Sequence, residues 1–270
     1  MFVKNQSIKT CALLLVLCML FPAFNASAES DEELAKKTLN PVASLISLPL
    51  QLNQDYNIGA EDASRTTLNI QPVIPVSVNQ DMNVIIRTIV PFIWAESPVD
   101  GGENVSGMGD TVQSFFLSPK DPWNGWIIGF GPVFLYPTAA EDSLGSQRWG
   151  AGPTGVMLRQ DSGFTYGLLF NHIWSFSGND DRAKVSATFL QPFFGYSTKT
   201  FTTLMVNTES TYDTKTNEWT VPINVTLSQM LKIAGQPLTL QVGYRNYTDV
   251  PEGGPNWGLR FAITFLFPKG

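Results

Sequence analysis

The chain has 270 residues, of which 43% are hydrophobic and 15% are charged, and its formal net charge is −6 at pH 7. This acidic balance argues against nucleic-acid binding, which requires basic patches. Both cysteines, Cys11 and Cys18, lie near the N-terminus. We therefore expect no disulfide and no cysteine metal site in the remainder of the chain.

The first element has the pattern of an export signal. Lys4 and Lys9 form a positive region, residues 11–21 (CALLLVLCMLF) form an apolar run, and residues 26–28 (ASA) fit the small-residue cleavage pattern. The apolar run is shorter than the roughly 20 residues that cross a bilayer as a helix. We expect residues 1–28 to be a cleaved signal peptide, with an N-terminal membrane anchor as the alternative.

The next segment, residues 29–44, is expected to lie in the periplasm. Its acidic start suits the dipole of a short helix over residues 29–40. Such a segment either plugs a barrel or forms a loose periplasmic tail, and the sequence favours the tail.

From residue 45 onward the chain contains repeated short stretches in which apolar and polar residues alternate. In residues 219–228, Trp219, Ile223 and Leu227 share one face while Thr220 and Asn224 share the other. Similar alternation predicts further strands. They lie at residues 46–53, 68–78, 126–136, 166–175, 238–245 and 258–267, with weaker alternation at 84–94, 111–118, 149–159, 186–196 and 202–212.

The last predicted strand has the most apolar face. Leu259, Phe261, Ile263, Phe265 and Phe267 point one way, whereas Gly258, Arg260 and Thr264 point the other. This stretch resembles the C-terminal assembly signal of bacterial outer-membrane proteins, although three residues follow its last aromatic. We expect it to engage the barrel-assembly machinery.

These features predict an all-β protein, a transmembrane antiparallel up-and-down β-barrel of about 12 strands over residues 45–270. A chain without a long apolar helix can cross a membrane only as a closed barrel. An even strand count places both termini in the periplasm, with short turns there and longer, acidic loops outside. We therefore expect the cell outer membrane as its location, with outer-membrane lipid and lipopolysaccharide as partners.

Prolines inside the predicted strands oppose this interpretation. Each one removes a ladder hydrogen bond and requires a bulge or a shorter strand. They leave a secreted soluble β-sandwich as an alternative fold. The residues concerned are Pro49, Pro72, Pro75, Pro91, Pro132, Pro153, Pro192 and Pro222.

Several segments together resemble a family of Gram-negative outer-membrane transporters named for the MetA pathway of phenol degradation. The resemblance covers most of the chain after the signal. Its segments are residues 40–53 (NPVASLISLPLQLN), 107–120 (GMGDTVQSFFLSPK), 131–139 (GPVFLYPTA), 149–158 (WGAGPTGVML), 171–178 (NHIWSFSG) and 219–237. The resemblance implies a barrel and the passage of small molecules, and it supplies no catalytic motif.

Polar residues on the inward faces of the strands are the candidate site. Charges inside a membrane protein need partners or water, and they often mark a pathway. Arg260 in particular needs water or a partner such as Glu209. A charge-selective constriction and a bracing ion-pair network are both open interpretations of this set. Its members are Arg87, Glu209, Arg245 and Arg260, accompanied by Asn207, Gln241, Gln71 and Asn224.

His172 is the single histidine, and Ser175 follows three residues later. Outer-membrane lipid hydrolases use a His–Ser pair on the barrel wall. Residues three apart on a strand point to opposite faces, however, so we expect His172 beside Trp174 and no catalytic pair. We expect no cofactor and no metal, because the acidic loop residues match no calcium-binding spacing.

The expected function is a passive channel or transporter for small molecules, hydrophobic or aromatic ones included. A closed structural or adhesive barrel is the main alternative. A lipid-modifying barrel enzyme is a further one, for which His172 is the candidate base.

Overall fold

The computed structural model describes residues 31–268, so the predicted signal peptide lies outside the described residues. One short helix precedes a sheet of fifteen strands. The elements are α2 (Asp31–Thr38), β1 (Ile46–Ile58), β2 (Ala63–Ile70), β3 (Val73–Ser77), β4 (Met82–Ala95), β5 (Val105–Met108), β6 (Thr111–Pro119), β7 (Trp126–Tyr136), η1 (Asp142–Leu144), β8 (Arg148–Asp161), β9 (Phe164–Gly178), β10 (Ser186–Ser197), β11 (Thr202–Thr208), β12 (Ser210–Asp213), β13 (Glu218–Ile233), β14 (Gln236–Asp249) and β15 (Trp257–Phe267).

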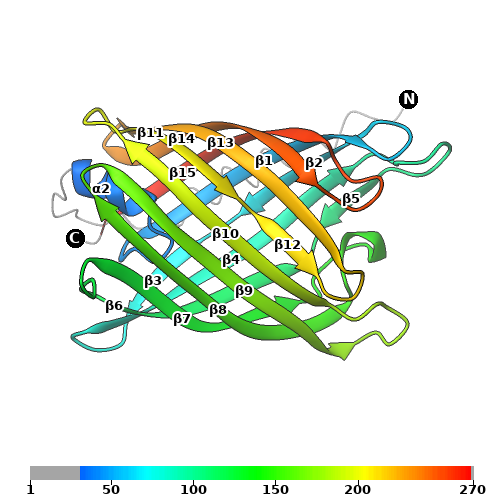
Figure 1. Cartoon of the computed structure of the whole chain (residues 1–270), viewed down its shortest axis with the longest axis horizontal. Coiled ribbons are helices and arrows are strands. Elements are labelled where there is room, and N and C mark those ends of the chain that lie inside the picture. The colour runs from blue at the N-terminus through cyan, green and yellow to red at the C-terminus, as the bar shows by residue number, and fades with distance from the viewer. Residues whose placement is uncertain (1–30, 269–270) are drawn as a thin grey trace.

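The sheet closes into an antiparallel barrel in which the chain runs along the wall twelve times. Three of these twelve passes are each divided into two strands, namely β2 with β3, β5 with β6, and β11 with β12. The first and last strands close the barrel, with Ile46 opposite Phe267 and Tyr56 opposite Trp257 (Figure 1). The predicted up-and-down barrel of about 12 strands is confirmed, and the soluble sandwich is wrong.

The prolines are accommodated by local irregularities. Pro72 lies in the break between β2 and β3, and Pro222 lies at a register shift between β13 and β14. Pro132 and Pro153 are opposite each other on β7 and β8. The ladder from β7 to β6 and the ladder from β8 to β9 are both interrupted at these positions. The missing proline donors therefore coincide with gaps that the sheet already contains.

A glycine precedes each of these paired prolines and allows the neighbouring strand to approach closely. A Cβ on Gly152 would lie 1.7 Å from the carbonyl oxygen of His172, and one on Gly131 would lie 2.0 Å from that of Phe115. Only a residue without a side chain fits at such distances.

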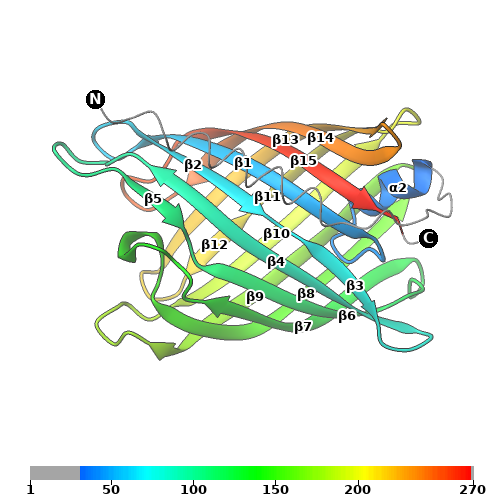
Figure 2. The same ribbon diagram turned by 180° about the vertical axis from the view of Figure 1, so that it is seen from behind.

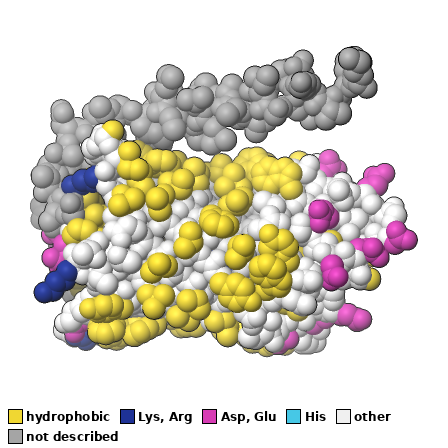
Figure 3. Space-filling view, turned by 90° about the horizontal axis from the view of Figure 1, so that it is seen from above, with side chains coloured by type: hydrophobic (Ala, Val, Ile, Leu, Met, Phe, Trp, Pro, Cys, Tyr) yellow, Lys and Arg dark blue, Asp and Glu magenta, His cyan; other side chains and the backbone are white. Residues whose placement is uncertain are grey.

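The outer surface of the barrel is a belt of exposed apolar side chains (Figure 3). Leu204, Val225, Val242 and Phe261 are between 43% and 53% exposed, although each lies in the middle of a strand. Aromatic pairs lie near the strand ends, with Trp126 against Tyr166 near one end of the barrel and Tyr212 against Trp219 near the other. A closed barrel with an apolar belt between aromatic girdles is the structure of an outer-membrane protein.

No helix within residues 31–268 has the length and apolar character needed to span a membrane.

The N-terminal segment packs against one end of the barrel instead of forming the loose tail that was expected. Helix α2 and the end of β15 lie together at this end in both views (Figures 1 and 2). Leu34 and Ala35 of the helix are buried in a cluster with Leu45, Met230 and Leu266. The Nε2 atom of Gln160 donates to the carbonyl oxygen of Lys36 at 2.8 Å. We call this the helix end and the opposite one the loop end.

The two ends differ in charge and in loop length. Short turns join the strands at the helix end, for example residues 162–163 and 234–235, whereas residues 96–104, 137–147 and 250–256 form longer loops at the other. Acidic side chains gather at the loop end (Figure 3). They include Glu61, Asp62, Glu96, Asp100, Glu103, Glu141, Asp142, Asp180, Asp181, Asp249 and Glu252.

Candidate functional site in the barrel lumen

A belt of charged side chains crosses the middle of the lumen. Its centre is Glu209, which lies in the one-residue break between β11 and β12. The guanidinium of Arg260 on β15 donates to both carboxylate oxygens of Glu209, at 2.8 and 2.7 Å. The Nε atom of Arg260 also donates to Oδ1 of Asn53 at 2.8 Å. This two-pronged pairing is the strongest ion-pair geometry that an arginine makes with a carboxylate.

A second carboxylate, Asp55, extends the belt toward the loop end. The hydroxyl of Tyr247 donates to its Oδ1 at 2.9 Å, and a nitrogen of Arg65 lies 3.8 Å from its Oδ2. Arg245 lies between the two carboxylates, 3.8 Å from Asp55 and 3.9 Å from Glu209. Its guanidinium also lies over the ring of Tyr247, 5.4 Å from the centroid.

Arg87 lies on the helix-end side of the belt and differs from the other arginines. Its Nη2 atom donates to Oε1 of Gln71 at 2.9 Å, a neutral acceptor. Within residues 31–268, no carboxylate lies within ion-pair distance of Arg87. The belt thus contains four arginines, Arg65, Arg87, Arg245 and Arg260, and two carboxylates. Its fixed charge is therefore positive.

Neutral polar groups complete the belt. The Nδ2 atom of Asn224 donates to Oδ1 of Asn207 at 2.7 Å, and Nε2 of Gln241 lies 3.4 Å from the hydroxyl of Thr226. Among the described residues, Oδ1 of Asn224 and Nε of Arg245 are buried without a hydrogen-bond partner. Buried polar atoms are nearly always paired, so these two atoms are unsatisfied positions within the network.

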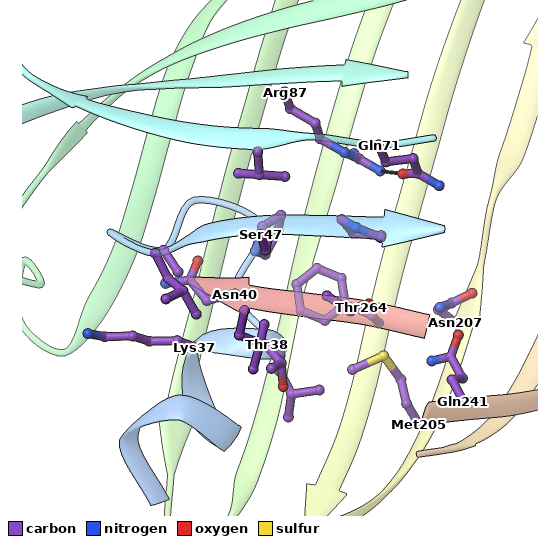
Figure 4. A pocket seen from close by; sticks show the side chains of 18 of the residues that line it. Lys37, Thr38, Asn40, Ser47, Gln71, Arg87, Met205, Asn207, Gln241 and Thr264 are labelled. Carbon is purple, nitrogen blue, oxygen red and sulfur yellow. Dashed lines mark hydrogen bonds between the residues drawn. The ribbon is translucent and has the colours of Figure 1, made fainter. Parts of the chain in front are cut away.

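Two separate cavities lie on either side of the belt. The outer cavity has a volume of about 560 Å³ and faces the loop end, where Asp55, Arg65, Glu209 and Arg245 line it. The inner cavity has a volume of about 210 Å³ and faces the helix end (Figure 4). Residues of the N-terminal segment, among them Lys37 and Asn40, lie on one side of the inner cavity. Arg87 and Gln71 lie on the other side, and Asn207 and Gln241 approach from the strands opposite.

The rest of the lumen at the helix end is filled by apolar side chains. We call this the apolar wall, and it consists of the inward residues Ile85, Phe116, Val156, Leu158, Leu169 and Phe193. Val42 of the N-terminal segment packs into the same cluster. We call the facing side, formed by the inward residues of β1, β2 and β11 to β15, the polar wall.

The structure brings three of the four predicted charged residues into direct contact. Glu209, Arg245 and Arg260 form one network, whereas Arg87 lines the inner cavity and donates to Gln71. Asn207, Asn224, Gln71 and Gln241 also lie in the lumen, as the strand parity predicted. Asp55, Arg65 and Tyr247 were missed. Asp55 has the parity of Asn53, Arg65 that of Asn69, and Tyr247 that of Arg245, so extending the three predicted strands by a few residues would have included them.

His172 and Ser175 are not hydrogen-bonded to each other in the structure. His172 packs against Trp174 at 4.1 Å between ring centroids, and its Nδ1 atom lies 2.7 Å from the hydroxyl of Thr188. The hydroxyl of Ser175 instead accepts a hydrogen bond from the backbone of Val185. Nε2 of His172 lies 3.4 Å from the hydroxyl of Ser186, but this serine is buried.

Searches of protein families and of curated sequences returned no match to this chain. Solved structures do resemble it. An outer-membrane channel from Pseudomonas putida F1 superposes with a TM-score of 0.65 at 15% identity, covering 83% of this chain and 96% of that one. Outer-membrane phospholipase A from Escherichia coli gives a TM-score of 0.48 at 13% identity, covering 87% and 98% of the two chains. At these identities the first similarity establishes the barrel fold alone.

Proposed function

We propose that this protein is a passive outer-membrane channel for small molecules, hydrophobic or aromatic ones included. The observation that carries the proposal is the charged belt, with its excess of arginine, set between two cavities inside a closed barrel. Fixed charges along a narrow passage select solutes by charge. The Pseudomonas putida channel of the same fold and the resemblance to the MetA family of transporters both support this proposal.

The route runs along the polar wall, past the belt and beside the N-terminal segment. The two cavities have no lining residue in common, and Glu209 and Arg245 of the belt line the outer one.

Planar bilayer recordings test this function. Purified protein should produce ion-current steps with a preference for anions, because the belt is positive. Glu209→Gln should increase that preference and Arg245→Gln should decrease it. Lys215→Gln, at an exposed position in a loop, should change it much less. Bilayers and liposomes that stay impermeable to ions and small solutes would rule out the channel.

A closed structural or adhesive barrel is the second candidate. The packing of Leu34 and Val42 into the helix end favours it, since these side chains narrow the lumen. This second candidate predicts that bilayers and liposomes stay impermeable to ions and small solutes, which is the outcome that would rule out the channel.

A further inference from the structure

The inner cavity has the chemistry of a binding site. It combines a cation, a set of neutral polar side chains and an apolar surface in a volume of about 210 Å³. This combination differs from that of the outer cavity, which is lined by Asp55, Glu209 and Glu252 as well as by arginines. No aspartate or glutamate within residues 31–268 lines the inner cavity.

Arg87 provides the positive charge. One of its nitrogens donates to Gln71, which leaves the other donors of the guanidinium without an acceptor among the described residues. A planar guanidinium with free donors matches a carboxylate, which accepts two parallel hydrogen bonds. Lys37 also lines the cavity, but its ammonium group points away from Arg87 (Figure 4).

The apolar part of the lining lies beside this charge. Val73, Phe193, Met205 and Leu266 contribute side chains from four different strands. A dry cavity of about 150 Å³ lined by apolar side chains is large enough to hold benzene. The inner cavity therefore has room for one aromatic ring that carries a carboxylate.

We propose that the inner cavity binds a small organic anion with an apolar body, such as an aromatic carboxylate, whose carboxylate pairs with Arg87. The ring lies against Phe193 and Met205, and the amides of Gln71, Asn207 and Gln241 surround the charged group. This inference deepens the proposed function by naming a solute class, but binding itself does not depend on conduction.

Equilibrium titration of the detergent-purified barrel with benzoate tests the site. Benzyl alcohol lacks the charge and acetate lacks the ring, so each should bind at least about tenfold more weakly than benzoate. Arg87→Gln should weaken benzoate binding by about tenfold or more, whereas Lys215→Gln, which removes a positive charge at the loop end, should not.

A second variant covers the case in which Arg87→Gln does not fold. Gln191 lines the cavity, and no hydrogen bond of its side chain links it to another described residue. Gln191→Phe should fill the space and abolish benzoate binding while all the arginines remain.

Absence of saturable benzoate binding by the wild-type protein would overturn the site, as would equal binding by Arg87→Gln or by Gln191→Phe. The outcome is separable from the channel test. If the barrel binds benzoate but passes no current, the site is retained and the proposed function is wrong. If the barrel passes current but does not bind benzoate, the proposed function is retained and the site is wrong.

Discussion

The two walls of the lumen are built from the same alternation of strand residues, but one carries a polar network and the other is packed with apolar side chains. Inward residues of the polar wall, such as Asn53, Glu209 and Arg260, form a hydrogen-bonded network. Inward residues of the apolar wall, such as Phe116 and Leu158, are fully buried and fill the interior. In this barrel, facing the lumen does not by itself mean facing water. One side is packed as a protein core, and the other carries the charged network.

Removing the central carboxylate should have the largest effect on the polar wall. Glu209→Gln breaks the pairing with Arg260 and leaves the belt's arginines with Asp55 as their remaining carboxylate. Loss of one partner from a largely buried pair destabilises a protein by about 3–5 kcal/mol. Urea unfolding of the barrel in lipid vesicles measures this loss. Glu218→Gln, at an exposed position, is the control, and equal stability of the two variants would contradict the structural role of the network.

The matching test on the apolar wall is Leu158→Ala. Leu158 is fully buried, and truncating a buried leucine destabilises a protein by about 2–5 kcal/mol. Met157→Ala is the control on the adjacent lipid-facing position, where the side chain is 46% exposed and leaves no cavity. The same urea series compares the two. Similar losses would mean that the apolar wall is not packed as a core.

A smaller loss of stability is expected at positions where two neighbouring strands approach each other closely. Gly152→Ala places a methyl group against the carbonyl of His172, and such overpacking costs about 1–3 kcal/mol. Gly195→Ala is the milder comparison, because its nearest neighbours lie at 3.2 Å. The fraction of heat-modifiable, folded barrel on gels measures both. If Gly152→Ala folds as well as Gly195→Ala, the ladder gap beside Pro153 is not as tight as described.

The smallest effect on global stability is expected at the helix. Leu34→Ala removes contacts with Leu45, Met230 and Leu266 at the rim only. Hydrogen exchange should show faster exchange of the α2 amides with little change in the unfolding of the barrel. Unchanged protection of α2 would contradict the packing role of Leu34. Single-channel current should also rise, because the helix narrows one mouth.

Strands whose inward residues are polar, such as β13 and β15, are predicted better than strands whose inward residues are apolar, such as β4, β6 and β8, for a physical reason. Alternation was clear in β13 and β15, where lipid-facing apolar residues alternate with inward polar ones. It was weak in β4, β6 and β8, because Ile85, Phe116 and Leu158 make the inward face apolar as well. Two apolar faces leave no period of two to detect.

The site was predicted in part for a similar reason. β1 was expected to end at residue 53, yet it continues to Ile58 through the segment NQDYN. This segment is polar on both faces, so alternation ends before Asp55 although the strand does not. The pairing of Arg260 with Glu209 joins strands 51 residues apart and depends on a break at Glu209 that no local pattern indicates.

The acidic loop end has an electrical consequence. Its carboxylates surround one mouth of a lumen whose centre is positive, whereas the other mouth has lysines beside its acids, among them Lys36 and Lys120. A mouth with net negative charge accumulates cations and depletes anions in the adjacent solution. Anions would reach the central arginines more easily from the helix end than from the loop end. Current through this barrel should therefore be rectified, and the asymmetry should fade as added salt shortens the screening length.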